Sequence, residues 1–214
     1  TSTNSSIGLI YALKKILMKI FVIDTEYLSW KSNDHDFRNL NNPPEIIQIY
    51  IKEIYSFSKK DILLFIKPKY CKKYPKRIEK LTSIKKSFLD KKGINFADAY
   101  KIISKFIPKN SIIISNGNES KIINFNIKLN KIKKIRKIIY FFDFNDLLKF
   151  FYPRIFKNKN NFISIDKIKK IFNLKKTKNH NAKNDVMTLV NFIKKERIKK
   201  NFFYKKKLFH KFIL

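Results

Sequence analysis

The sequence predicts an α/β fold in which a mixed five-stranded sheet is flanked by helices. Short apolar runs with short connections fill the first third of the chain, a pattern typical of three antiparallel strands. From about residue 95 onward, segments with helical periodicity alternate with short apolar runs, which indicates helices alternating with strands of the same sheet. With 214 residues, 44% of them hydrophobic, the chain is long enough for one domain with a sizeable core.

The first three strands are predicted from short apolar runs. Residues 20–24 form a buried strand that ends in an acid, and residues 45–54, "EIIQIYIKEI", partly alternate in polarity. A polar loop at 33–44 separates these two strands. A third strand at 61–68 is stopped by Pro68. The short connections indicate an antiparallel meander.

Helices and strands alternate in the second part of the chain. Helical periodicity is present around residues 76–84 and at 95–107, where Asn95 is the predicted N-cap and Pro108 follows the end. The later elements are a strand at 111–115, a helix from about 118, a strand at 137–144 whose Asp143 caps the next helix, and two or three helices within 145–200.

The chain is expected to form one domain at residues 18–200, followed by a basic, aromatic tail at 201–214. Residues 1–17 are expected to be an extension or a cloning remnant, because "MKIFVIDTEY" leads directly into a strand from Met18. The apolar run before it is interrupted by lysines, so neither a signal peptide nor a membrane span is expected. Cys71 is the only cysteine, which excludes an intrachain disulfide and a cysteine-based zinc site and fits the reducing cytoplasm.

The charge balance is strongly basic, with 49 Lys and Arg against 16 Asp and Glu and a net charge of +33. One explanation is a polyanionic partner, nucleic acid above all, because lysines gain affinity by releasing counterions from phosphates. The other is codon bias, since Lys, Asn, Ile, Phe and Tyr share A/T-rich codons. Both explanations stay open from the sequence alone.

A few acids stand out against this basic background. Asp24 and Glu26 end the first strand two residues apart, so they share a face, where burial would require a cation. Glu119 falls in the first turn of a predicted helix, and Asp185 begins another, five residues after His180. Each has a simpler explanation: a frayed, solvated strand end for the first pair, and a favourable helix dipole for Glu119.

Together these residues predict a metal-dependent phosphodiester hydrolase. Carboxylates from one strand end and two helix starts can converge on one pocket, and such oxygen ligands suit Mg²⁺ or Mn²⁺. His180 at the rim of that pocket would be placed to take a proton from water. This donor set is typical of two-metal phosphodiester hydrolysis.

The sequence resembles the DEDDh-type 3′–5′ exonucleases, a family that includes proofreading exonucleases, RNase T and oligoribonuclease. The motifs "VIDTEY", "EIIQI", "LTSI", "KGINFADAYKII", "SNGNE" and "HNAKND" occur in the family's order and spacing over about residues 18–195. The likeness is greatest to the branch that trims histone mRNA and small RNAs. It implies an RNase H-like fold, two divalent ions, and release of 5′-mononucleotides from single-stranded 3′ ends.

The resemblance also assigns roles to single residues. Asp24, Glu26, Glu119 and Asp185 would be metal ligands, and His180 the general base. The implied substrate-binding residues are Thr25, Tyr27, Leu81, Thr82 and Asn116. Two positions depart from the family pattern: Glu119 stands where the family has Asp, and Ser83 stands where it often has Gly.

Several alternatives remain open at this stage. A nuclease fold that binds nucleic acid without cleaving it would follow if Glu119 cannot replace the usual Asp. A polymerase-associated proofreading subunit would need a partner-binding segment, and the tail contains no such motif. Tyr27, Trp30 and Phe37 either stack on bases or pack in the protein, while His35 and His210 are expected to be solvated. The choice between RNA and DNA, and the oligomeric state, are left open.

Overall fold

The structure, a computed structural model, describes residues 19–29, 42–55, 60–133, 138–156, 162–175, 177–178, 180–196, 198 and 210–213. The predicted extension at 1–17, most of the predicted loop at 33–44 and tail residues 201–209 lie outside the described residues, and so do Trp30, His35 and Phe37. In the part of the chain that is described, no helix has the length and apolar character needed to cross a membrane.

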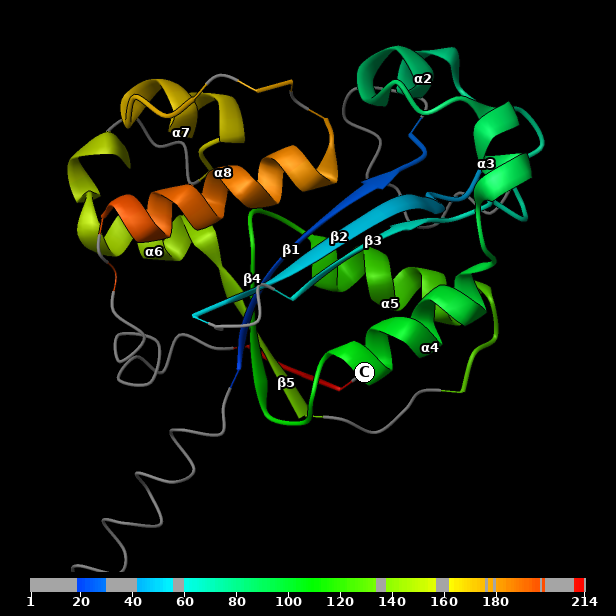
Figure 1. The fold of residues 1–214 in the computed structure, drawn as a ribbon, viewed down its shortest axis with the longest axis horizontal. Helices are drawn as coiled ribbons and strands as arrows, with labels where there is room; N and C mark the ends of the chain where they lie inside the picture. Colours follow the sequence, from blue (N-terminus) through cyan, green and yellow to red (C-terminus); the bar gives the residue numbers. More distant parts are fainter. Residues whose placement is uncertain are drawn as a thin grey trace, which may run out of the picture.

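Six strands form one mixed sheet in the order β3-β2-β1-β4-β5-β6 (Figure 1). β1, β2 and β3 pair antiparallel, β4 and β5 continue from β1 in parallel, and β6 pairs antiparallel with β5. The strands are β1 Ile20–Tyr27, β2 Ile46–Ile54, β3 Asp61–Phe65, β4 Ser111–Ser115, β5 Ile138–Asp143 and β6 His210–Ile213. The predicted fold class is confirmed for the first five strands, and β6, drawn from the predicted tail, adds a sixth.

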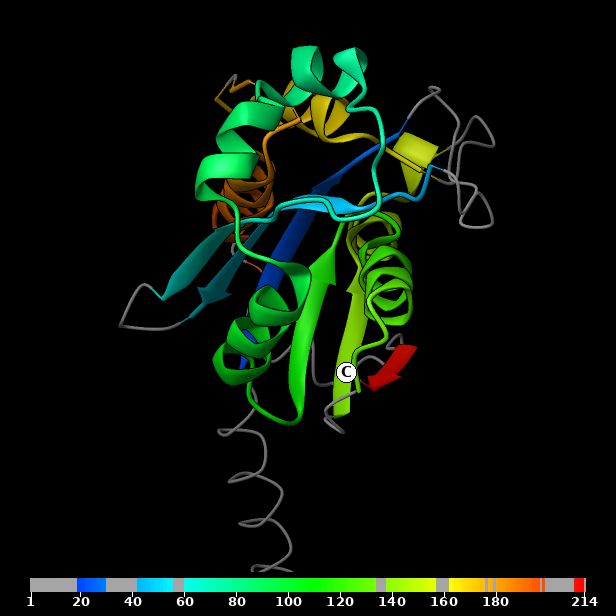
Figure 2. The same cartoon turned by 90° about the vertical axis from the view of Figure 1, so that its right-hand side faces the viewer.

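Helices cover both faces of this sheet, with α6, α7 and α8 on one side and α4 and α5 on the other (Figures 1 and 2). The helices are α2 Lys76–Thr82, α3 Lys86–Lys92, α4 Phe96–Phe106, α5 Glu119–Leu129, α6 Phe144–Phe151, the 3₁₀ helix η1 Pro153–Phe156, α7 Ile165–Ile171 and α8 Ala182–Lys195. Only α3 has no counterpart in the prediction.

The central strand β1 contributes to the core on both sides. Phe21 and Ile23 pack with α4 and α5, whereas Ile20 and Val22 pack with α6 and α8. Successive side chains of a strand point to opposite faces, so a strand covered on both faces is apolar at every position. This explains the continuous apolar run at 20–23, with which β1 begins.

Predicted caps fix the starts of two helices. The Asn95 side chain accepts a hydrogen bond from the N–H of Asp98 at 2.9 Å and begins α4. The Asp143 carboxylate accepts one from the N–H of Asn145 at 2.8 Å and begins α6. Both caps satisfy backbone donors that have no partner inside the helix, and both confirm the sequence prediction.

A buried amide joins α5 to the start of β2. Asn126 accepts a hydrogen bond from the N–H of Ile46 at 3.1 Å and donates to the carbonyl of Pro44 at 3.0 Å.

β1 and β4 are parallel neighbours, so the C-terminal ends of both strands lie at one edge of the sheet. The starts of α5 and α8 are brought to this same edge, where ligands bind in open α/β sheets.

Candidate active site

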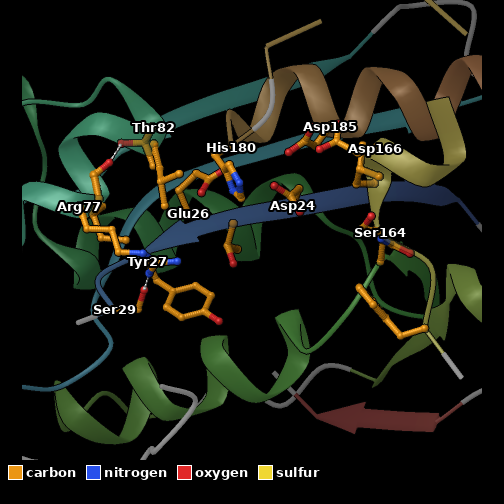
Figure 3. A pocket seen from close by; sticks show the side chains of 16 residues that line it. Asp24, Glu26, Tyr27, Ser29, Arg77, Thr82, Ser164, Asp166, His180 and Asp185 are labelled. Atoms are coloured by element: carbon orange, nitrogen blue, oxygen red, sulfur yellow. Dashed lines mark hydrogen bonds between the residues drawn. The ribbon is translucent and has the colours of Figure 1, made fainter. Parts of the chain in front are cut away.

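Three carboxylates meet at the C-terminal end of β1. Asp24 and Glu26 come from the strand, and Asp185 comes from the first turn of α8. One oxygen of each side chain lies within 4.8 Å of the other two, and Figure 3 shows them in a common pocket. The structure thus brings together three of the four predicted acids, from one strand end and one helix start, and their role as metal ligands stays a prediction.

A side chain of β2 sets the position of α8 beside β1. Gln48 is buried and lies opposite Glu26 in the β1–β2 pairing. Its Oε1 accepts a hydrogen bond from the backbone N–H of Ala182, the first residue of α8, at 2.9 Å. The side chain of Asn181 caps the same helix. The first turn of α8, which carries Asp185, is therefore held next to Glu26.

Burial raises the pKa of each of the three carboxyls, and repulsion by neighbouring acids raises that of Asp24 and Glu26 further. Burial raises the pKa of Asp24 well above its ordinary value, and the charges of Glu119, Glu26 and Asp185 raise it further. The pKa of Glu26 is raised to about 8 by burial, then by Asp185 and Glu119. Burial also raises the pKa of Asp185, while the ammonium of Lys169 opposes this effect. Three anions this close together, one buried and two partly buried, need protons or a cation to compensate them.

The donor set fits a hard divalent ion. Carboxylate oxygens are the ligands that Mg²⁺ and Mn²⁺ prefer in proteins. Oδ1 of Asp185 is buried and accepts no hydrogen bond in the described part of the chain, although the Lys169 ammonium lies 3.6 Å away. This one ammonium faces three carboxylates, so a bound cation is still needed to compensate the cluster. The acid cluster is thus compatible with a divalent metal, without selecting which one.

Glu119 stands apart from this group of three acids. It is the first residue of α5 and only 8% exposed, and the group within 4.8 Å does not include it. Its charge is nevertheless the largest charge effect on the pKa of Asp24. Burial raises the pKa of Glu119 itself to about 7, and a hydrogen bond from the Ser115 side chain opposes the increase. Glu119 therefore acts on the site electrostatically, and its role as a ligand stays a prediction.

The Glu119 carboxylate borders a second cavity next to the acid pocket. Both cavities share Tyr27, Asn116 and Phe162 in their walls. Gly117 has a φ of +146°, which side chains rarely adopt, and a Cβ there would lie 3.6 Å from Oε2 of Glu119. Oε2 has no hydrogen-bond partner among the residues that the structure describes. The loop before α5 thus brings a buried, unpaired carboxylate oxygen close to the acid pocket.

The acid pocket has a volume of about 310 Å³ and contains nine of the ten predicted site residues. Those nine are Asp24, Thr25, Glu26, Tyr27, Leu81, Thr82, Asn116, His180 and Asp185. Glu119 is the predicted residue that does not line it. The placement agrees with the predicted set, whereas the roles of the single residues remain predictions.

His180 lies at the solvent side of the pocket. Its backbone φ is +53°, in the left-handed region where His occurs more often than most residues. Its side chain is exposed, and Figure 3 shows the imidazole beside Glu26 and Asp24. An exposed imidazole next to the acids is able to exchange protons with solvent, as a general base must.

Seven further residues, which the sequence motifs do not single out, line the pocket: Ser29, Arg77, Ile78, Phe162, Ser164, Ile165 and Asp166. Arg77, from α2, donates a hydrogen bond to Oγ of Ser29 at 3.3 Å. Phe162 is 51% exposed, which is high for an aromatic side chain. An isolated Phe in the polar run "NKNNFIS" was the available signal for a contact residue, although the sequence does not place it near Asp24.

A buried network of amides holds the segment that carries Phe162. Asn145 donates to Oδ1 of Asn116 at 2.8 Å and accepts from the N–H of Ile163 at 2.7 Å. Asn116 in turn donates to the carbonyl of Ile163 at 3.3 Å. The end of β4, the start of α6 and the approach to α7 are thereby fixed to one another, and Phe162 is placed at the pocket wall.

Comparison with known families gives one match over most of the chain. The RNase T family model, described as exonuclease, matches residues 21–193. A search of curated protein sequences gave no match.

The solved structures with similar folds include several nucleases. One is a structure described as 3′-end specific recognition of histone mRNA stem-loop by 3′-exonuclease. It has a TM-score of 0.66 at 12% identity, and the match covers 92% of this chain and 90% of that one. The nuclease domain of 3′hExo, a DEDDh family member bound to rAMP, has a TM-score of 0.63 at 14% identity, covering 83% and 92%. Cell-death related nuclease 4 has a TM-score of 0.64 at 16% identity, covering 84% of this chain, which spans 63% of that nuclease. At such identities the likeness shows the fold.

Proposed function

This chain belongs to the RNase T exonuclease family, and from that membership we propose that it removes nucleotides from the 3′ end of single-stranded RNA or DNA. The products are a 5′-mononucleotide and a strand shortened by one residue. The observation that carries the proposal is the group Asp24, Glu26 and Asp185 at the base of a pocket that His180 also lines.

Asp24, Glu26 and Asp185 would hold a divalent ion, Mg²⁺ or Mn²⁺, and Glu119 would assist a second one. Bound ions of this kind polarise the scissile phosphate and stabilise the leaving oxygen. The negative charges of these acids would compensate the positive charge of the bound ions. The Gln48 and Asn181 contacts keep Asp185 in register with Glu26, so the ligand positions are set before an ion enters.

His180 would act as the general base. A ring nitrogen takes a proton from the attacking water, whose oxygen forms a bond to phosphorus. The bond from phosphorus to the 3′ oxygen of the preceding nucleotide breaks, and that oxygen leaves with the electron pair and gains a proton from solvent. The exposure of His180 then allows the imidazolium to return its proton to water.

The pocket walls offer contacts for the terminal nucleotide. Tyr27 and Phe162 present aromatic faces on which bases can stack. Arg77 supplies a permanent positive charge for a phosphate. Leu81 and Thr82, from the predicted "LTSI" motif, line the α2 side of the same pocket. The exposed Phe162 supports a substrate role, because exposure of an aromatic ring is otherwise unfavourable.

The known relatives support a nucleic-acid partner. One structural neighbour is a 3′-exonuclease that recognises a histone mRNA stem-loop, and another is a nuclease domain with bound rAMP. The net charge of +33 favours the same partner. We further propose a cytoplasmic location, supported by the single cysteine, Cys71, which is a free thiol.

The test uses 5′-labelled RNA and DNA, single- and double-stranded, incubated with Mg²⁺, Mn²⁺ or EDTA. A ladder of labelled products that shorten progressively, with none in EDTA, is the expected result. Immediate release of a labelled mononucleotide would show the opposite polarity. Failure to degrade any strand with either ion would contradict the proposal.

A second candidate is a nuclease fold that binds nucleic acid without cleaving it. The position of Glu119 outside the three-carboxylate group favours this alternative. It would be supported by tight binding of single strands combined with no cleavage under Mg²⁺ or Mn²⁺. A polymerase-associated proofreading role is weaker, because the chain shows no partner-binding motif to support it.

A further inference from the structure

A lysine is buried directly beside the acid cluster. Lys169, in α7, is only 5% exposed, and its Nζ lies 3.6 Å from Oδ1 of Asp185. The same ammonium donates a hydrogen bond to the carbonyl oxygen of Thr177 at 3.4 Å. Both side chains of this ion pair are shielded from solvent, at 5% and 10% exposure.

Lys169 occupies a position that would suit an apolar residue. It follows Ile165 by four residues, so both lie on one face of α7, and its neighbour Ile168 is fully buried in the core. A buried ammonium is costly unless a buried anion compensates it. Asp185 supplies that anion, and the positive charge in turn opposes the effect of burial on Asp185.

We propose that Lys169 is a positioning residue that serves as a built-in counter-charge: it holds Asp185 in place in the metal-free protein and lowers the affinity of the acid cluster for a divalent ion. The inference rests on the proposed metal-dependent function. A fixed positive charge beside a ligand repels an incoming ion, and the repulsion is strong at short range in a buried site. Lys169 thus lowers the affinity for the ion and keeps Asp185 in its ligand position before an ion binds.

The first test measures ion binding by calorimetry on the full chain, freed of metal with EDTA and then dialysed, with Mn²⁺ or Mg²⁺ as titrant. Lys169→Met removes the charge and keeps the length of the side chain. We expect its dissociation constant for Mn²⁺ to fall at least ~10-fold, which corresponds to about 1.4 kcal/mol of charge repulsion removed. Lys170→Met is the matched control, because Lys170 is exposed on the same helix, and its dissociation constant should stay unchanged.

The second test measures the melting temperature without metal. Lys169→Met should melt at a lower temperature than the parent, since Asp185 is left as an unpaired buried acid. In an Asp185→Asn background the same substitution should have a much smaller effect. If Lys169→Met does not fold, Lys169→Gln replaces it, since the amide still reaches towards the Thr177 carbonyl without a charge.

The outcomes separate this inference from the proposed function. A parent chain that binds Mn²⁺ while Lys169→Met and Lys169→Gln bind it no more tightly overturns the counter-charge alone. A parent chain that binds neither ion overturns the metal-dependent function and the inference with it. A purely structural lysine would lower the melting temperature and leave the Mn²⁺ dissociation constant unchanged, which also counts against the proposal.

Discussion

The side chain of Gln48 accepts a hydrogen bond from the backbone N–H of Ala182, 134 residues later in the chain. Ala182 begins α8, and the first N–H groups of a helix have no partner inside the helix. Gln48 therefore satisfies a buried donor and, at the same time, fixes the helix that carries Asp185 against the strand next to Glu26.

Gln48→Leu should lower both stability and activity. The leucine keeps the approximate volume but leaves the N–H of Ala182 buried without an acceptor, which costs about 1–3 kcal/mol. Chemical denaturation measures this loss, and single-turnover assays measure the rate. Gln48→Leu with unchanged cleavage at full ion saturation would show that the Asp185 position does not depend on this bond.

Asp24→Asn should remove cleavage while the protein stays folded. Removal of a metal ligand should slow cleavage by more than the roughly 10–100-fold that is typical when a residue behind the ligands is mutated. The fold should persist, because a buried carboxylate that is repelled by its neighbours destabilises the metal-free protein. Circular dichroism and the strand-degradation assay give the two readouts. Asp90→Asn, at an exposed position of α3, is the control, and an active Asp24→Asn would refute the assigned role.

The metal-free protein should become less stable as the pH rises from about 5 to about 8. The pKa of Glu26 is raised from 4.5 to about 8, so over this window the folded chain binds more protons than the unfolded chain. Its stabilising protonation is complete below the unfolded pKa and is lost as the pH rises through the folded pKa. Denaturation in EDTA across this window measures the effect.

Glu26→Gln tests the origin of this pH dependence. At about pH 8 the metal-free variant should exceed the parent in free energy of unfolding by at least about 1.4 kcal/mol, the equivalent of one pKa unit. Mg²⁺ should stabilise the parent at this pH and have little effect on the variant. Equal stability of parent and variant across the range would show that ionised Glu26 does not destabilise the metal-free protein.

Glu119→Gln should slow cleavage less than Asp24→Asn does. Glu119 lies outside the three-carboxylate group but acts on Asp24 through its charge, so a reduction of about 10–100-fold is expected, as for an outer partner of a metal site. The concentration of Mg²⁺ needed for half-maximal rate should rise. Ser120→Ala, one residue away, should matter little. Full activity of Glu119→Gln would mean that three carboxylates suffice.

Binding of single strands should depend steeply on salt. Each phosphate contact on a single strand contributes about −0.7 to the slope of log K against log salt concentration. Fluorescence anisotropy of a labelled oligonucleotide in EDTA gives this slope without cleavage. A flat line would mean that the lysine excess reflects codon bias and is spread evenly over the surface.

Local patterns in the sequence predict most of the sheet and most of the site. β1 and β4 are recognisable from the apolar runs at 20–23 and 112–114, which are buried because both faces of the sheet are covered. The spacing of Asp24 and Glu26 follows from the two-residue period of a strand, and the place of Asp185 follows from the start of an amphipathic helix. These features depend on neighbours in sequence, so they can be inferred without knowledge of the fold.

Features that depend on distant contacts were missed. β6 is a strand only because it pairs with β5, and α3 buries a single residue, Leu89, which is too weak a pattern to predict. The position of Gln48 opposite Glu26 follows from the register of β1 and β2, which apolar periodicity does not reveal. Lys169 appears as an ordinary surface lysine until α7 is placed against α8.

Five amide side chains link the elements around the pocket: Gln48, Asn116, Asn126, Asn145 and Asn181. An amide has no proton to gain or lose over the physiological pH range, and it competes poorly with carboxylates for a hard cation. Acidification, chelation or ion exchange therefore changes the charge of the acids and of the Lys169–Asp185 pair without loosening these amide contacts. The strand and helix ends that carry the acids stay linked, so the site can lose and regain an ion without refolding.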